Sequence, residues 1–381
     1  MIKASDIRTT FCDAPVEAWP RAKAVITPLY TAQEKNWHFC HHPEIGAFRG
    51  QLYAMWSNAP VGEDELGQRI LYARSADGQH WSEPEILCRR IPGEDQPRVL
   101  TAAGWLDQGD SLAAYFASYE YETEEIRTDR QGNSLLGKGI VRTRLFAQTT
   151  ADGVHFADPV DLQVPLCPNF GPQRTKGGRL IITGNWAHAV TDRPDGVTPG
   201  SWALHGFDPG QPLLRTPVRD DPDYFGYVSQ TAGLPGLCEG AFYQTDDGAL
   251  HMLYRSSEDY LYYSVSEDEG DSWSFPEKTG FTNCRSKFVL GRLPDGRFYY
   301  IGNPKPGSGR NPLVLSLSED GKVFDRHFLI ESDPCERKYS GFVKNGAYAY
   351  PHSAVLNHTL YVVYSIYKED VRVAAVPLDT L

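Results

Sequence analysis

The sequence predicts an all-β fold made of repeated small sheets. Aromatic residues make up 12% of the 381 residues, and 35 glycines and 27 prolines accompany them. Aromatic side chains favour strands, whereas Gly and Pro favour the turns between strands. A short turn motif also occurs four times along the chain, each time after a β-rich run. Recurrence of this kind is typical of a repeat architecture, in which similar units pack side by side.

The most complete copy of the turn motif is Ser266–Trp273, which reads Ser-Glu-Asp-Glu-Gly-Asp-Ser-Trp. Asp268 can bond its own backbone two residues on, and Gly270 accepts a positive φ, so both suit a tight hairpin turn. Trp273 can fold back beneath that turn. In the other copies the aromatic residue comes one position earlier, and these copies are Ser75–Trp81, Thr150–Phe156 and Ser318–Phe324.

Read as Ser-x-Asp-x-Gly-x-x-Trp, this turn resembles the Asp-box of sialidases and related β-propellers. The resemblance implies a β-propeller, in which a four-stranded blade needs about 45–65 residues. Six such units fit the chain, and they begin near Trp37, Leu100, Asn169, Cys238, Ser286 and Tyr348. A seven-bladed alternative needs a finer division of residues 95–215. We treat residues 1–381 as a single propeller domain, to which residues 1–35, with a strand at Ala24–Tyr30, contribute a closing edge strand.

Composition excludes several classes of protein. No run of about 18 apolar residues occurs, so no membrane span is predicted. The start of the chain, Met1–Asp6, lacks the apolar core of a signal peptide. This predicts a cytoplasmic protein, or a secreted one whose signal peptide is absent from this chain. Seven scattered cysteines without a C-x-x-C pair argue against a disulfide framework or a zinc site. A net charge of -12 disfavours binding to nucleic acid, but it is compatible with an acidic sugar held by local arginines.

Polar residues on innermost strands are the first candidates for a site, because these strands converge on the axis of a propeller. Glu239 lies beside a glycine in an otherwise apolar strand, where an unpaired carboxylate would be costly. Arg255 ends the next strand and can reach Glu239. Tyr350 and His352 alternate on the last innermost strand and therefore share a face. Arg310 lies in a glycine-rich loop before another strand.

The order of these residues resembles that in sialidases, which place Glu and Arg in one blade, a second Arg before an Asp-box strand, and a Tyr in a late innermost strand. The resemblance spans most of the chain and is specific from about Glu239 to Ser365. It implies that Tyr350 is a nucleophile, that Glu239 is its base, and that Arg255 and Arg310 bind a substrate carboxylate. A phenol with a pKa of about 10 needs such a base. A guanidinium fork matches a carboxylate in bidentate fashion.

The N-terminal third departs from the sialidase pattern. Where that family carries Arg-Ile-Pro, the chain has His41–Pro43, so one carboxylate-binding arginine is missing. The acid/base Asp of the family would fall within Glu63–Glu65, of which we select Asp64. His41 and His42 join the catalytic candidates, because an imidazole that titrates near neutrality suits proton transfer. The predicted substrate-binding set is completed by His188, His352 and Arg285.

Two long connections, Tyr119–Lys138 and Asp220–Pro235, are predicted to border the site.

Three functions remain open from the sequence. The first is an exo-glycosidase of the sialidase superfamily that removes a terminal carboxylated sugar from a glycan, and the Glu239/Tyr350 pair favours it. The second is a polysaccharide lyase that performs β-elimination at a uronic acid, as rhamnose–glucuronate lyases do, and the His41/His42 pair favours it. The third is a glycan-binding propeller without catalysis. Each predicts an acidic oligosaccharide or polysaccharide as partner, with no nucleic acid, no membrane and no cofactor, and leaves open a metal ion bound by the histidines.

Overall fold

The computed structural model describes residues 2–92, 98–121, 126–128, 134–136, 140–185, 187–206, 234–341 and 343–381. Much of the predicted 119–138 connection and nearly all of 220–235 lie outside the described residues. Strands dominate the described chain, and its few helices are 3-10 turns of three residues. None of them has the length or apolarity that crossing a membrane as a helix would require.

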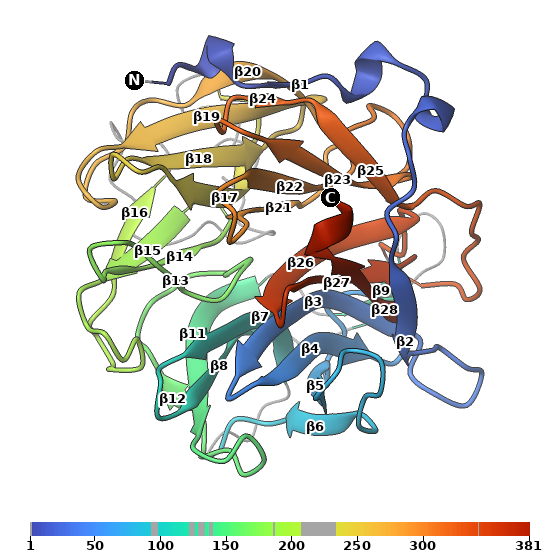
Figure 1. Ribbon diagram of the computed structural model, residues 1–381. Coiled ribbons are helices and arrows are strands. Elements are labelled where there is room, and N and C mark those ends of the chain that lie inside the picture. The colour runs from blue at the N-terminus through green and yellow to red at the C-terminus, as the bar shows by residue number, and fades with distance from the viewer. Residues whose placement is uncertain are drawn as a thin grey trace.

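The strands form small antiparallel sheets arranged around a central axis, which is a β-propeller (Figure 1). The first sheet contains β3 (Phe39–Phe48), β4 (Gln51–Ala59), β5 (Arg69–Ser75) and β6 (Glu85–Cys88). The second contains β7 (Val99–Asp107), β8 (Leu112–Tyr121), β11 (Ile140–Thr150) and β12 (Val160–Asp161), with a hairpin of β9 (Ile126–Thr128) and β10 (Ser134–Leu136) between β8 and β11. The third contains β13 (Gln173–Arg174), β14 (Leu180–Thr183), β15 (Ala187–Thr191) and β16 (Ala203–Gly206).

The second half of the chain continues the ring. Its first sheet contains β17 (Cys238–Gln244), β18 (Leu250–Arg255), β19 (Tyr260–Ser266) and β20 (Glu277–Thr282), and is extended by β1 (Arg8–Thr9) and β24 (Val323–Phe324). The next contains β21 (Val289–Arg292), β22 (Phe298–Gly302), β23 (Leu313–Ser318) and β25 (Arg326–Glu331). The last contains β26 (Tyr348–Leu356), β27 (Thr359–Ile366), β28 (Asp370–Pro377) and β2 (Val25–Tyr30).

The prediction of six blades, or alternatively seven, is wrong in number. Five sheets of the described chain have the four-stranded form of a blade, and the other two are the β9–β10 hairpin and a sheet of six strands. The six-stranded sheet is larger because β1 pairs in parallel with β20 on one side and with β24 on the other. Strand β24 comes from the loop that joins β23 to β25 in the following sheet. The composition and periodicity of residues 1–35 gave no sign of this insertion, since β1 is only two residues long.

The two ends of the chain meet in the last sheet. Strand β2 pairs antiparallel with β28, so that Val25 lies opposite Ala375. The outermost strand of this sheet therefore comes from the N-terminal segment, whereas the three inner strands come from the C-terminal end (Figure 1).

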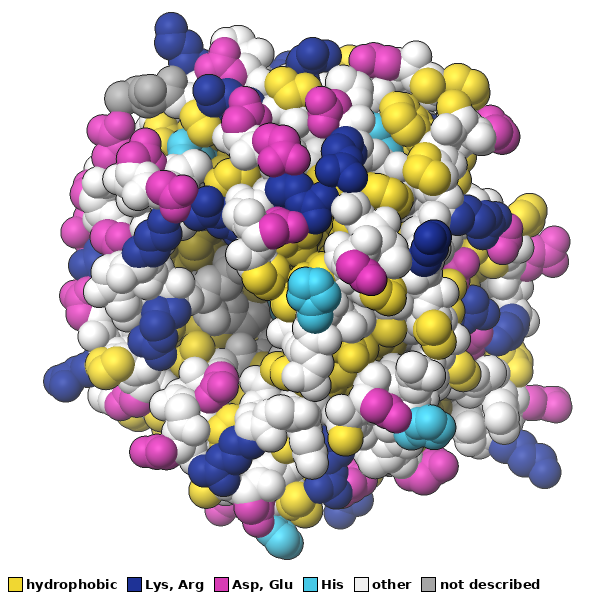
Figure 2. Space-filling view, in the orientation of Figure 1, with side chains coloured by type: hydrophobic (Ala, Val, Ile, Leu, Met, Phe, Trp, Pro, Cys, Tyr) yellow, Lys and Arg dark blue, Asp and Glu magenta, His cyan; other side chains and the backbone are white. Residues whose placement is uncertain are grey.

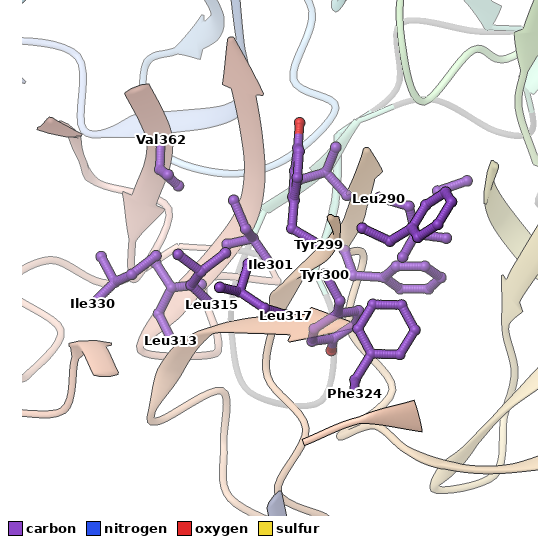
Figure 3. Packing of buried hydrophobic residues seen from close by; sticks show 14 of the residues in the cluster. Leu290, Tyr299, Tyr300, Ile301, Leu313, Leu315, Leu317, Phe324, Ile330 and Val362 are labelled. Atoms are coloured by element: carbon purple, nitrogen blue, oxygen red, sulfur yellow. The ribbon is translucent and has the colours of Figure 1, made fainter. Parts of the chain in front are cut away.

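The hydrophobic core lies between neighbouring sheets. In Figure 3, Ile301 of β22 and Leu315 of β23 lie on the side of their sheet that faces Val362 of β27 in the last sheet. Complete burial of an aliphatic or aromatic side chain of this size stabilises the fold by about 1.5–3 kcal/mol. The surface is different, because Lys/Arg and Asp/Glu side chains are interspersed over the face that Figure 2 shows.

The four predicted turns have the hydrogen bonds that their sequence implies. In Ser75–Trp81 the Ser75 hydroxyl donates to Asp77 Oδ1 over 3.1 Å and accepts from the Gly78 amide over 2.8 Å. Asp77 Oδ1 also accepts from the amides of Gln79 and His80. The hydrogen bond from the His80 amide, followed by those from the His80 ring and the Gln79 amide, holds the pKa of Asp77 well below its ordinary value. The indole of Trp81 closes the turn by donating to the Gly78 carbonyl over 3.1 Å.

Each of these turns also packs against the preceding sheet of the ring. The Tyr361 hydroxyl of the last sheet donates to the Asp77 carbonyl over 3.2 Å, and the Tyr243 hydroxyl donates to the Gly321 carbonyl over 2.5 Å. The glycine of each turn leaves almost no room for a Cβ atom, and the facing residues are Tyr361 for Gly78, Tyr53 for Gly153, Ile181 for Gly270 and Tyr243 for Gly321. The turns therefore fasten neighbouring sheets to each other.

We expect Gly153→Ala to lower the free energy of unfolding by about 2–4 kcal/mol. Gly153 has a φ of +76°, and a Cβ there would lie 2.0 Å from the Tyr53 hydroxyl. Gly248→Ala is the matched control, because its φ of +92° imposes similar backbone strain while no atom lies within 4 Å of the new Cβ. Chemical denaturation measures both variants. An equal loss in the two variants would show that the contact with Tyr53 contributes nothing.

Candidate active site

The predicted site residues gather at one end of the propeller axis. Glu239 and Tyr350 lie near the starts of the innermost strands β17 and β26, and His41 lies near the start of β3. Neighbouring strands in a sheet are antiparallel, so the start of the innermost strand lies beside the end of the next strand. In this way Arg255, the last residue of β18, lies beside the start of β17. The Asp-box turns follow the third strands and lie at the opposite end of the sheets, as Ser266–Trp273 after β19 does.

Backbone irregularities aim these side chains. The strands β3, β17 and β26 each show a register shift against the second strand of their sheet at this point. His42, Glu239 and Tyr350 have φ values of 52°, 51° and 54° there. A bulge re-aims a side chain, and a positive φ at a residue other than glycine costs free energy that the surrounding fold must offset. The same costly conformation on three converging strands is a feature of functional sites.

Tyr350, Glu239 and Arg255 form one hydrogen-bonded group. The Tyr350 hydroxyl donates to Glu239 Oε1. Arg255 Nη1 donates to Glu239 Oε2 over 2.6 Å and to the Tyr350 hydroxyl over 3.1 Å. The three residues come from two sheets and were predicted together from the order of the sequence.

The surroundings of this group shift the pKa values of Tyr350 and Glu239 in opposite directions. Burial and the neighbouring Glu239 charge raise the pKa of Tyr350 well above its ordinary value. Burial alone would also raise the pKa of Glu239, but the charge and hydrogen bond of Arg255 outweigh it and lower that pKa. At neutral pH the phenol therefore holds its proton, and Glu239 is an ionised acceptor in contact with it.

Four cationic side chains surround Tyr350. Besides Arg255, Arg310 Cζ lies 5.4 Å from the centre of the Tyr350 ring, Lys287 Nζ lies 5.5 Å from it, and Lys368 Nζ lies 6.0 Å from it. The sequence prediction included both arginines and missed both lysines. Neither position carries a clear signal, because Lys287 follows Arg285 by two residues and Lys368 lies in an ordinary hairpin turn.

His41 and His42 lie against Tyr350, with ring centres 4.0 and 5.5 Å from its ring. His41 Nδ1 lies 3.0 Å from the Ser365 hydroxyl, and His42 Nδ1 lies 3.2 Å from the Ser57 hydroxyl. Burial lowers the pKa of His41 well below its ordinary value and that of His42 to about 3. Both imidazoles are therefore neutral at pH 7. This corrects the expectation that they titrate near neutrality.

Of the acidic residues in the β4–β5 loop, Glu63 contacts two side chains that lie around Tyr350, Lys368 and His42. Glu63 Oε2 accepts from Lys368 Nζ over 2.9 Å, and Oε1 lies 3.8 Å from His42 Nε2. Asp64, which we selected from sequence, has a φ of 59°, and its amide donates to Gln68 Oε1 over 3.2 Å. Glu65 accepts from the Val61 amide. The role of Asp64 stays a prediction.

Three predicted substrate-binding residues lie apart from the Tyr350 group. His188 of β15 packs with its ring centre 5.4 Å from both His205 and Trp273, between two sheets. His352 Nε2 lies 3.2 Å from Glu44 Oε2, further along the axis. Arg285 is 57% exposed, and its Nε donates to Asp259 over 3.1 Å. A direct substrate contact of these three residues stays a prediction.

A buried ion pair lies beside the site and was also missed. Lys287 Nζ donates to Glu44 Oε1 over 2.7 Å and to the Asn169 carbonyl, and both charged side chains are almost fully buried. Lys287 Nζ also lies 4.1 Å from the centre of the Phe170 ring. Burial raises the pKa of Glu44 to about 8, although the Lys287 charge opposes that rise. Lys287 thus links the Tyr350 surroundings to the strands of the first sheet.

Comparison with solved structures identifies the fold. A protein described as a sialidase superposes with a TM-score of 0.65 and 20% identity over 94% of this chain, which spans only 33% of that protein's length. The NanB sialidase from Streptococcus pneumoniae gives 0.63 and 12%, over 93% of this chain and 70% of its own. The intramolecular trans-sialidase from Ruminococcus gnavus gives 0.62 and 11%, over 93% of this chain and 98% of its own.

Comparison of sequences identifies the family. A search of curated proteins finds no match. The family described as "BNR repeat-like domain" matches residues 50–363, which is most of the chain and includes the four Asp-box turns. The chain therefore belongs to the family of BNR repeat-like domains, and its fold is that of the sialidase superfamily.

Proposed function

We propose that this protein is a glycoside hydrolase of the sialidase superfamily that removes a terminal carboxylated sugar from a glycan. The observation that carries the proposal is the Tyr350–Glu239–Arg255 group. It combines a phenol, an ionised carboxylate in hydrogen-bond contact with it, and a guanidinium that contacts both. A phenol becomes an effective nucleophile only when a base of this kind removes its proton.

In the proposed reaction, Tyr350 attacks the anomeric carbon while Glu239 takes the phenolic proton. A bond forms between the Tyr350 oxygen and the sugar, the glycosidic bond breaks, and a carboxylic acid of the β4–β5 loop protonates the leaving oxygen. Asp64 remains our candidate for that acid, and Glu63 is the alternative because of its contact with Lys368. Water then attacks the anomeric carbon and gives a proton to the β4–β5 carboxylate, the glycosyl–tyrosine bond breaks, and Glu239 returns the proton to Tyr350.

The charge around Tyr350 supports an anionic sugar. Arg255, Arg310 and Lys368 present positive charge near the ring, and Nη1 of Arg310 is buried without a hydrogen-bond partner among the described residues. A buried donor of this kind needs an acceptor, and a carboxylate oxygen supplies one. We do not propose a lyase, because neither the matching family nor the similar solved structures support one.

Product analysis tests the proposed function. The protein is incubated with aryl glycosides of N-acetylneuraminate, glucuronate and galacturonate and with acidic oligosaccharides, and Tyr350→Phe serves as the inactive control. We expect release of a free acidic monosaccharide from one of these substrates. A gain in ultraviolet absorbance from an unsaturated uronate would identify a lyase instead. Binding without any turnover would identify a glycan-binding propeller.

A further inference from the structure

With Asp64 as the acid, the proposed hydrolysis assigns no step to His41, His42 or Glu63, which lie together. One ligand atom of each side chain lies within 4.8 Å of the others. Two imidazoles and one carboxylate are the ligands of a common class of open zinc sites, in which a fourth position remains available. We propose that these three residues bind a divalent transition-metal ion of the zinc class at the mouth of the axis, beside Tyr350.

The hydrogen bonds around His41 leave one of its nitrogens ready for a metal. The Ser365 hydroxyl donates to the Ala349 carbonyl over 3.3 Å, so its oxygen accepts from the Nδ1–H of His41 over 3.0 Å. That bond places the lone pair of His41 on Nε2. His41 is completely buried, and this Nε2 has no hydrogen-bond partner among the described residues. A metal-binding histidine commonly has its other nitrogen fixed by a hydrogen bond in this way.

Glu63 is oriented as a ligand and not only as a partner of Lys368. Its Oε2 accepts from Lys368 Nζ over 2.9 Å, whereas Oε1 points toward His42 Nε2 at 3.8 Å. Carboxylates that bind metals are usually held by such a second hydrogen bond. The side chains of His42 and Glu63 are 17% and 12% exposed, so an ion from solvent can reach them.

Nearby charges set the expected strength of the site. Lys368, Lys287 and Arg310 all oppose a cation at His41. Lys368 lies beyond the far oxygen of Glu63, and the ionised Glu239 and Glu63 offset part of this positive charge. We therefore expect weaker binding than at a structural zinc site, where the ligands include thiolates and lack cationic neighbours.

Calorimetric titration of chelator-treated protein with Zn²⁺ tests the proposal, and Co²⁺ provides visible absorption as a signature of imidazole coordination. We expect one ion per chain. His42→Ala and Glu63→Gln should each weaken Zn²⁺ binding at least about tenfold, and Ser365→Ala should weaken it by about 10–100-fold through the loss of orientation of His41. The control is His155→Ala, which removes an exposed histidine paired with Asp152 and should leave the affinity unchanged.

Thermal unfolding of each variant without metal verifies that it is folded. The proposal is overturned if the wild-type protein binds no Zn²⁺, or if His42→Ala and Glu63→Gln bind it as tightly as the wild type. The readout needs no substrate, so its failure leaves the proposed hydrolysis untouched. Equally, absence of hydrolysis would not affect the metal titration.

Discussion

The variant Tyr350→Phe should lose at least about 10³-fold in kcat/KM on the acidic glycoside identified by product analysis. The substitution removes the oxygen that would form the bond to the sugar and leaves the ring, with its contacts to His41 and Arg310, in place. The control is Tyr299→Phe, since Tyr299 is a buried tyrosine whose hydroxyl lies 3.0 Å from the Ser353 hydroxyl. Its kcat/KM should remain near that of the wild type.

Glu239→Gln should lower kcat/KM by roughly 10²–10⁴-fold, because the amide cannot take the phenolic proton. Residues that act as one unit are not additive. The double variant Tyr350→Phe/Glu239→Gln should therefore be no slower than the slower single variant. If the two losses multiply instead, Tyr350 and Glu239 act in separate steps, and the proposed base–nucleophile pair is incorrect.

Lys287→Met should destabilise the fold by about 3–5 kcal/mol, because it leaves Glu44 buried without its cationic partner. The double variant Glu44→Gln/Lys287→Met should recover much of that loss, since neither buried charge remains. Chemical denaturation with a reversible transition measures the free energy of unfolding. Both residues lie deep beside the axis, where water cannot replace the missing partner.

The exposed pair Lys278–Glu258 provides the contrast for this measurement. Its atoms are 2.8 Å apart, but both side chains are more than 40% exposed. Lys278→Met should change the free energy of unfolding by less than about 1 kcal/mol. A loss for Lys287→Met as small as that for Lys278→Met would show that the buried pair contributes only as a surface pair does.

Local sequence patterns predicted much of the architecture. The strand expected at Ala24–Tyr30 appears as β2, and each Asp-box forms the turn that its Ser or Thr, Asp and Gly imply. These features depend on residues close in the chain, so their signals are local. The structure brings Glu239, Arg255 and Tyr350 into contact, whereas their catalytic roles stay a prediction.

Only the tertiary structure brought the two lysines next to Tyr350, set the partners of His188 and Arg285, and added β1 and β24 to one sheet. The physical reason is that burial and charge partners are set by segments far apart in the chain. Lys368 meets Glu63 across more than 300 positions, and His42 becomes neutral because its surroundings exclude water. The sequence by itself determined the repeated sheets and the order of Glu239, Arg255 and Tyr350, whereas the folded ring decided which charges surround them.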